Sequence, residues 1–264
     1  MNQDYWQRQD ITKPLYPDLV WSRPENKALS GKLLIMGGNV HGFAAAAEAY
    51  AAATKSGIGV ARVLLPDSLE KTLGRFFETG EYMPSTPSGS FSRSALAPSL
   101  AGSLWADGVL LAGDFGRNSE TAILLEQFVL KYKGQLVVTK DAVNYFNDLP
   151  KILLERPDTV LVLTMAQLQK LATAARYTKA FTFNMDFIRL VETLHTFSET
   201  YEASVIIKHL DTIFIADKGK VTTTKLSSNT PIWRVETAAK ASVWWIQNPS
   251  QTLAALTTAL VDQA

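Results

Sequence analysis

The chain of 264 residues contains no cysteine. This absence excludes disulfides, metal sites built on thiolates and cysteine nucleophiles. An excess of charge of one sign is also lacking, because 26 Lys and Arg residues oppose 25 Asp and Glu residues, for a formal net charge of +1. The electrostatic signature of a protein that binds nucleic acid or an anionic membrane surface is therefore missing.

The sequence also has no long uninterrupted apolar run. Its most apolar stretch, Phe43 to Pro66, contains Glu48, Lys55 and Arg62, whereas a membrane-spanning helix needs about 20 consecutive apolar residues. Residues Met1 to Asp10 lack the basic start and apolar centre of an export signal. We therefore expect a soluble, cytoplasmic protein that does not enter a membrane.

What is present is a globular composition in which strand and helix patterns alternate. The hydrophobic fraction of 47% excludes intrinsic disorder, and the length suits one large α/β domain. Short apolar runs such as Lys32–Met36 and Val60–Leu65 alternate with helical patterns such as Phe43–Ser56 and Ser119–Tyr132. This alternation predicts a mostly parallel sheet with helices on both faces. We expect a single domain over residues 1–264, with residues 1–20 as an N-terminal extension or helix.

The last third of the chain changes character. Three strand patterns follow one another closely, and the turn Asp217–Lys220 is expected to join the last two as a hairpin. The segment Gly80–Ser103, rich in Pro, Ser and Gly, is expected to be mainly surface loop. The remaining predicted strands are Asp107–Ala112, Gln135–Thr139, Thr159–Leu163, Ser204–Lys208, Thr212–Ala216 and Val221–Leu226, and the remaining helices are Asp67–Phe77, Met165–Ala174, Met185–Tyr201, Glu236–Gln247 and Ser250–Asp262.

A glycine-rich turn, Gly37–Gly42, lies between a predicted strand and a predicted helix. Backbone N–H groups at a helix start can hold a phosphate there, but the spacing matches neither GxGxxG nor GxxxxGK[ST], and a tight turn without a ligand explains the glycines equally well. Asp67 occupies the place of a ribose-binding carboxylate after the second strand, although helix capping is the favoured role for it. His41, in the turn, is the one histidine that we expect to face a ligand, and no histidine spacing indicates a metal site.

Two later segments also contain residues that can bind a ligand, and each has a purely structural explanation as well. In Lys208–Thr212, between two strands, a lysine can counter phosphate charge and a threonine can donate a hydrogen bond, but a solvated β-turn fits as well. The stretch Arg234–Trp245 opens a helix with small residues that allow a ligand to approach its N-terminus. A plain alanine-rich first turn followed by a buried aromatic pair is the alternative.

Taken in order, from about Leu15 to about Leu260, these segments resemble the ADP/ATP-dependent NAD(P)H-hydrate dehydratases, a branch of the ribokinase-like superfamily. The sequence RPENKALSG followed by KLLIMGGN resembles the opening RP…KGxxG, strand and GGS turn of that family, and the alanines after Gly42 match its TGAA helix. Ala112–Gly116 stands at the GPGLG motif, Thr139–Asn144 at DADALN and Lys208–Thr212 at KGAxT.

The resemblance implies a ribokinase-like three-layer α/β/α sandwich with a mostly parallel central sheet and a C-terminal β-hairpin region. It also implies ATP or ADP as cofactor, NAD(P)H hydrate as a ligand, Mg²⁺ only together with the nucleotide, and a homo-oligomer. The matching positions predict nucleotide binding by Lys208, Asp211, Thr212, Thr237 and Ala241, and substrate binding by Gly38, Asn39, His41, Ala45, Gly113, Asp114, Gly116 and Asp141.

The departures from the family affect its chemistry. Its glycine-rich TGGSGDVLAG motif reads TAAKASVWWI here, over Thr237–Ile246, so that Ser242 stands at the catalytic Asp. An ordinary serine hydroxyl cannot replace a carboxylate as general base near neutral pH, and Cβ atoms at the former glycines crowd a phosphate. The TPHPGE loop is reduced to Thr164–Leu168, and the GPGLG loop gains the charge of Asp114.

These departures favour a divergent homologue that has lost most or all of its activity while keeping a nucleotide or dinucleotide site over Gly37–Gly42 and Lys208–Thr212. Two alternatives stay open: an active dehydratase or small-molecule kinase that uses Asp141 or Asp211 as its acid, and a structural or partner-binding protein. The position of Trp244 and Trp245 separates them, since the pair either fills the former phosphate site or packs in the core beneath it.

Overall fold

The computed structural model describes residues 4–74, 80–226 and 233–262. Over these residues, ten strands form one sheet in the order β1-β10-β9-β8-β7-β6-β5-β2-β3-β4. The strands are β1 (Trp6–Gln9), β2 (Lys32–Gly37), β3 (Val60–Pro66), β4 (Gly80–Met83), β5 (Gly108–Gly113), β6 (Gln135–Thr139), β7 (Thr159–Leu163), β8 (Ser204–His209), β9 (Thr212–Asp217) and β10 (Lys220–Lys225).

Only β9 runs against the other strands of this sheet, because it pairs antiparallel with both β8 and β10. The hairpin between β9 and β10 forms where the sequence predicts it, with Lys218 and Gly219 at φ values of +46° and +76°. Both central residues of a type I′ turn require positive φ. The carboxyl ends of the other nine strands therefore meet at one edge, which we call the carboxyl edge.

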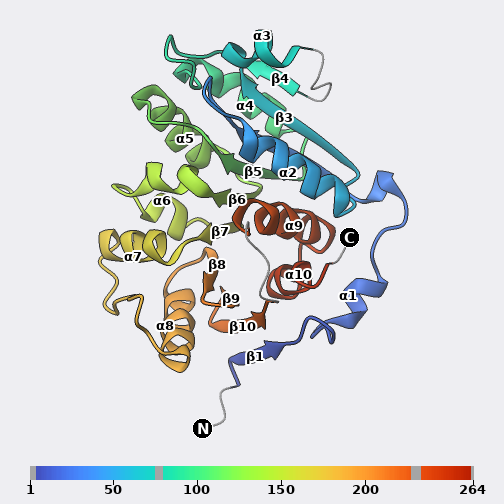
Figure 1. Cartoon of the computed structure of the whole chain (residues 1–264), viewed down its shortest axis with the longest axis vertical. Coiled ribbons are helices and arrows are strands. Elements are labelled where there is room, and N and C mark those ends of the chain that lie inside the picture. The colour runs from blue at the N-terminus through green and yellow to red at the C-terminus, as the bar shows by residue number, and fades with distance from the viewer. Residues whose placement is uncertain (1–3, 75–79, 227–232, 263–264) are drawn as a thin grey trace.

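Helices cover both faces of the sheet, which confirms the predicted α/β/α sandwich (Figure 1). On one face lie α2 (Ala44–Lys55), α9 (Arg234–Gln247) and α10 (Thr252–Ala259). On the other lie α4 (Leu96–Ser103), α5 (Ser119–Lys131), α6 (Lys151–Leu154), α7 (Met165–Ala174) and α8 (Phe187–Thr200).

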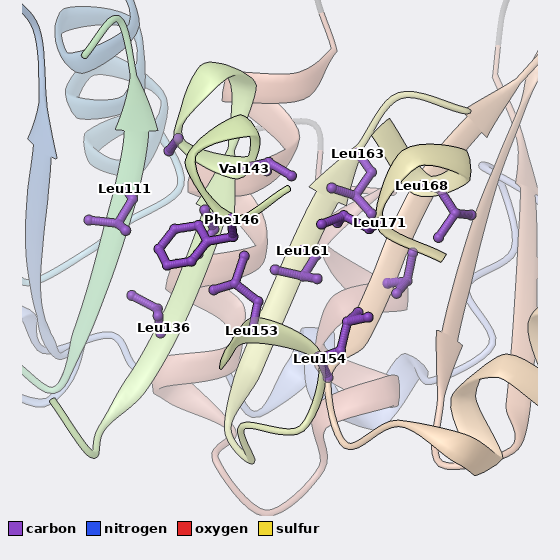
Figure 2. Close-up of a cluster of buried hydrophobic side chains, with 14 of the residues drawn as sticks. Leu111, Leu136, Val143, Phe146, Leu153, Leu154, Leu161, Leu163, Leu168 and Leu171 are labelled. Atoms are coloured by element: carbon purple, nitrogen blue, oxygen red, sulfur yellow. The ribbon is translucent and has the colours of Figure 1, made fainter. Parts of the chain in front are cut away.

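Alternate residues of the buried strands supply the two cores. In β2, Leu33 and Ile35 pack on the α2 and α9 side, whereas Leu34 and Met36 pack on the opposite side. The alanines of α2 let that helix lie close to the sheet, because a buried methyl group leaves little space between backbones. The opposite core is built on leucines: Figure 2 shows Leu136 and Leu161 of neighbouring strands among the side chains of Val143, Phe146, Leu153, Leu154, Leu168 and Leu171.

Two local predictions were wrong. The supposed loop Gly80–Ser103 contains β4, which pairs with β3, and helix α4. Asp67 caps no helix: its carboxylate accepts a hydrogen bond from the Ser85 backbone N–H at 3.1 Å. Instead of a helix over Asp67–Phe77, a 3₁₀ turn (Asp67–Leu69) leads into the short helix α3 (Glu70–Leu73), and residues 75–77 lie outside the described part.

The N-terminal residues are part of the sheet. β1 pairs in parallel with β10, and the Trp6 indole N–H donates to the Thr223 hydroxyl at 3.0 Å. The helix α1 (Pro17–Trp21) follows. Within the described ranges, no helix has the length and apolarity needed to cross a bilayer.

Candidate ligand site at the carboxyl edge

The strand order reverses between β2 and β5, because the chain adds β3 and β4 on one side of β2 and β5 to β10 on the other. In open α/β sheets, ligands bind outside the carboxyl ends of the strands at such a switch point. Here the strand ends touch: the Gly38 N–H donates to the Gly113 carbonyl at 3.0 Å, and the φ values of these residues are +94° and +112°. A Cβ atom on Gly37 would lie 2.6 Å from the Gly113 carbonyl oxygen, so glycine is needed at this close approach.

Asn39 connects the two loops of the switch point. Its side-chain amide donates to the Asp114 carbonyl at 2.6 Å, and its side-chain oxygen accepts the His41 backbone N–H at 2.7 Å. Asn39 is buried, whereas His41 is exposed. Asn39 therefore holds the loops together, and His41 presents its ring to solvent.

Asp114 lies at the centre of this arrangement. One oxygen of its carboxylate accepts the Ala45 backbone N–H at 2.8 Å, and the other contacts the Lys140 ammonium group at 2.7 Å. The N-cap residue of α2, Phe43, supplies no side-chain hydrogen bond, so a carboxylate from a different loop caps that helix. A negative charge is favourable there because the helix N-terminus carries partial positive charge.

Lys140 was not predicted as a site residue. Lys140 replaces the first alanine of the family's DADALN motif, and Asp114 replaces a glycine of its GPGLG motif. Taken alone, each substitution suggests no function. In the structure the two departures form one ion pair. The signal was therefore in the sequence, as a charge of each sign gained in two loops at the same sheet edge.

Asp141 fixes the loop that carries Asp114. Its carboxylate oxygens accept the backbone N–H groups of Asp114 at 2.6 Å and Gly116 at 3.2 Å. Burial raises the pKa of Asp141 above its ordinary value, although these two hydrogen bonds oppose the rise. The Tyr145 hydroxyl adds a bond to the Gly116 carbonyl at 2.7 Å.

The structure thus brings all eight predicted substrate-binding residues to one place.

Where the family has its TPHPGE loop, a capping box begins helix α7. The Thr164 hydroxyl accepts the Gln167 N–H at 3.2 Å, and the Gln167 side-chain oxygen accepts the Thr164 N–H at 3.1 Å. The same glutamine donates to the Lys140 carbonyl at 2.6 Å. Gln167 therefore supports the segment of Lys140 and Asp141 rather than offering an acid or an imidazole to a ligand.

Charged groups from α2 and α9 complete the surroundings of Asp114. Burial is the main reason that the pKa of Glu48, on α2, is raised, and the negative charges of Glu236 and Asp114 raise it further while Lys140 opposes them. On α9, Glu236 forms an ion pair with Lys240 at 3.0 Å. The starts of the two helices therefore share one electrostatic environment.

A cavity of about 580 Å³ opens beside Asp141 at this edge. Arg117, which is exposed and forms no ion pair with the described residues, supplies a positive charge at its wall. The volume is within the usual range for small-molecule sites. The lining residues are Gly116, Arg117, Asn118, Ser119, Asp141, Asn144 and Tyr145.

The region that replaces the glycine-rich TGGSGD turn is helical. Helix α9 begins at Arg234, and Thr237 donates its N–H to the Trp233 carbonyl at 2.8 Å. The Ser242 hydroxyl is buried and donates to the Ala238 carbonyl at 2.8 Å. Thr237 and Ala241 are buried too, so neither they nor Ser242 form an open turn. Alanine has the highest helix propensity and glycine a low one, which explains why the turn became helix.

Trp244 and Trp245 pack in the core and do not fill the switch point. Trp244 donates its indole N–H to the Asp262 carboxylate at 2.8 Å, and both indoles are buried in the same cluster as Leu33 and Ile35. The C-terminal half of α9, which carries both tryptophans, lies towards the opposite edge of the sheet. There the Gln247 side-chain amide donates to the carbonyl of Ser30, just before β2. The aromatic pair therefore leaves the carboxyl edge to other residues.

The predicted nucleotide-binding residues of Lys208–Thr212 form the turn between β8 and β9. Asp211 pairs with Lys225 at 3.3 Å, and hydrogen bonds from Lys225 and Thr212 lower the pKa of this exposed carboxyl. Thr212 lines a different cavity, of about 310 Å³, together with Arg8 and Phe187. Four strand spacings separate β8 from β2, or roughly 19 Å. The structure therefore separates these residues from the switch point.

Comparison with known proteins agrees with the resemblance in the sequence. No protein-family model matches the chain. A segment of 123 residues, 45% of the chain, is 30% identical to the bifunctional NAD(P)H-hydrate repair enzyme Nnr of Moorella thermoacetica and spans only 23% of that protein. The resemblance to the NAD(P)H-hydrate dehydratases is thus confirmed over part of the chain.

Solved structures confirm the ribokinase-like fold. A ribokinase-like superfamily protein from Enterococcus faecalis superposes with a TM-score of 0.72 at 13% identity, over 99% of this chain and 87% of that one. The ADP/ATP-dependent NAD(P)H-hydrate dehydratase of Bacillus subtilis, co-crystallised with ATP and Mg²⁺, gives a TM-score of 0.62 at 10% identity, over 94% and 86% of the two chains. At these identities the likeness establishes the fold.

Proposed function

We propose that this protein is a small-molecule binding relative of the NAD(P)H-hydrate dehydratases that does not transfer phosphate. The observation that carries the proposal is the position of Thr237–Ser242 inside α9. A phosphate needs backbone N–H groups that point at it from an open helix start. Inside a helix, those N–H groups bond to carbonyls one turn earlier.

The residues do not fit a magnesium–nucleotide complex of the kind in the Bacillus subtilis structure. A buried serine, Ser242, replaces the aspartate expected at this position. Alanines replace the three glycines expected near it, at positions 238, 239 and 241, and all three lie in helix α9. In the described part of the chain, no three or more carboxylates and imidazoles are grouped to hold a metal ion. We therefore derive no step through a metal or a transferred phosphate.

The ligand that we infer is a nucleotide or a dinucleotide bound at the carboxyl edge. The cavity beside Asp141 supports it, because its size suits a small molecule and Arg117 offers a cation to an anionic group. The turn of Lys208–Thr212 lies at the same edge. A ligand has to reach across roughly 10–14 Å to contact both places, because the cavity residues follow β5 and β6, which lie three and two strand spacings from β8.

The other candidate functions have weaker support. One of them is an enzyme that uses Asp211 as its catalytic acid or base. Asp211 is exposed and paired with Lys225, and the pKa of its carboxyl is lowered, which makes the carboxylate a poor base. Asp141 has a raised pKa but uses both oxygens to hold backbone N–H groups. A purely structural role would leave the cavity without a ligand. A single domain over residues 1–264, a cytoplasmic location and a homo-oligomer stay predictions.

Turnover of NADH hydrate with ATP or ADP tests the loss of catalysis. The purified protein is expected to give no turnover above the uncatalysed rate under conditions in which the Bacillus subtilis dehydratase is active. Turnover comparable to that enzyme would contradict the proposal and favour a rewired active site.

Thermal shift with AMP, ADP, ATP, NADH and NADPH tests binding separately. A ligand at 100 times its Kd stabilises a protein by about 2.7 kcal/mol. Arg117→Ala is expected to weaken binding of the ligand that stabilises the wild type, whereas Arg189→Ala, which removes an exposed arginine from the distant helix α8, is expected to leave it unchanged. The absence of any shift would favour the structural role.

A further inference from the structure

We propose that Asp114 determines ligand specificity by acting as a permanent internal anion at the start of α2. Its carboxylate occupies the position that a ligand phosphate or carboxylate would take between the Ala45 N–H and the Lys140 ammonium group. The switch point is thereby closed to anionic groups. This inference uses the proposed function only for the location of the ligand.

Two independent donors converge on the one carboxylate. The Ala45 N–H belongs to the first turn of a helix of 12 residues, and the Lys140 ammonium group reaches the second oxygen from the 3₁₀ helix (Lys140–Phe146) that follows β6. Both are the partners that proteins use to bind phosphate. The side chains of Asp114 and Lys140 are mostly buried, at 22% and 27% exposure, so solvent screens their attraction less than at an open surface.

The backbone around Asp114 is built to keep it in place. Asp114 itself has a φ of +59°, which an aspartate tolerates poorly compared with a glycine. Its N–H is held by Asp141 and its carbonyl by Asn39, which fixes the backbone from which the side chain projects, and turning the carboxylate away would break its bonds to Ala45 and Lys140. The side chain therefore competes with any anion that approaches α2.

The ligand class follows from this geometry. The part of a ligand that lies over β2 and β5 has to be uncharged or positively charged, because the Asp114 carboxylate occupies the helix start there and Glu48 adds a second acidic group close to it. Anionic groups of the same ligand are restricted to the neighbourhood of Arg117 or of the β8–β9 turn. A nucleotide satisfies both conditions if its nucleoside lies over the switch point and its phosphate lies near Arg117 or the β8–β9 turn.

The test is gain of anion binding in Asp114→Ala, measured with pyrophosphate by isothermal titration calorimetry. Removing the carboxylate frees the Ala45 N–H and the Lys140 ammonium group. We expect the variant to bind pyrophosphate at least roughly tenfold more tightly than the wild type, which is the gain that one charge-assisted hydrogen bond provides. Adding Lys140→Met to Asp114→Ala is expected to abolish the gain. Asp114→Ala with no gain, or with a gain that survives Lys140→Met, overturns the proposal.

Glu48→Gln is the matched control, because it removes a nearby negative charge without freeing Ala45 or Lys140; an equal gain in that variant contradicts the proposal. If Asp114→Ala does not fold, the wild type decides the matter through its ¹⁵N spectrum. Pyrophosphate is expected to leave the Ala45 amide resonance unmoved, and a saturable shift of that resonance would show an accessible anion site. Because pyrophosphate replaces the nucleotide in these measurements, failure of the proposed nucleotide binding leaves their outcome intact.

Discussion

The starts of α2 and α9 lie close together at the carboxyl edge, and we propose that each is closed to anions in a different way. At α2 the glycine turn remains, and a single side chain, Asp114, occupies the helix start. At α9 the turn itself has become helix, and Ser242 is buried one turn deeper. A charge that blocks a site can be removed by one substitution, whereas a backbone that has changed conformation cannot be restored by one.

The largest expected effect is that of Ser242→Asp at the α9 end. Adding the family's carboxylate places an unpaired charge at a position of 2% exposure, and the free energy of unfolding is expected to fall by about 3–5 kcal/mol. Urea denaturation measures the change, and turnover of NADH hydrate is expected to stay absent.

Ser242→Ala serves as the control, with a loss of about 1 kcal/mol or less, because it removes only the hydroxyl bond to Ala238. A stable, active Ser242→Asp protein would show that one side chain, and not the helical backbone, separates this chain from an enzyme. The contrast between the two helix starts would then disappear.

At the α2 end, Asp141→Ala is expected to lower the free energy of unfolding by about 2–3 kcal/mol, because it leaves the N–H groups of Asp114 and Gly116 without their acceptor. Asp107→Ala is the matched control: its carboxylate accepts one exposed N–H, that of Lys32, at 2.9 Å. Equal losses in the two variants, again measured by urea denaturation, would mean that Asp141 does not hold the loop.

How much of this the sequence predicts depends on how local each signal is. Strands such as Gln135–Thr139 and Thr159–Leu163 were predicted to the residue, because a buried parallel strand is a continuous apolar run between turns. Helix α4 was missed, since Pro98 and Gly102 resemble a loop, whereas Leu96 and Leu100 of the helix pack against the core in the folded protein.

The site shows the same division. The loops of Gly38 and Asp114 follow from their glycines and from the family register. The pairing of Asp114 with Lys140 joins residues 26 positions apart, and no local pattern announces it. At Thr237–Ser242 the alanines predicted a helix while the family register predicted a ligand site, and the local propensity decided the conformation.

A smaller effect is expected from the ion pair that closes the α2 end. A double-mutant cycle with Asp114→Asn and Lys140→Met is expected to give a coupling energy of about 1 kcal/mol. The exposed pair of Lys151 and Glu155, at 65% and 53% side-chain exposure, is the control, with about 0.3–0.5 kcal/mol. Thermal or urea unfolding of the four proteins of each cycle provides the values, and equal couplings would show that the Asp114 pair is an ordinary surface contact.

The smallest effect connects the two helix starts through Glu48. Burial raises its pKa above the ordinary 4.5, and Glu236 on α9 raises it while Lys140 lowers it. Its contribution to the free energy of unfolding is therefore complete below pH 4.5 and is lost as the pH rises through the folded-state pKa. In a carboxyl ¹³C NMR titration, Glu236→Gln is expected to lower the pKa of Glu48 and Lys140→Met to raise it. A pKa that moves with Lys140 but not with Glu236 would mean that the start of α9 is electrostatically separate from the start of α2.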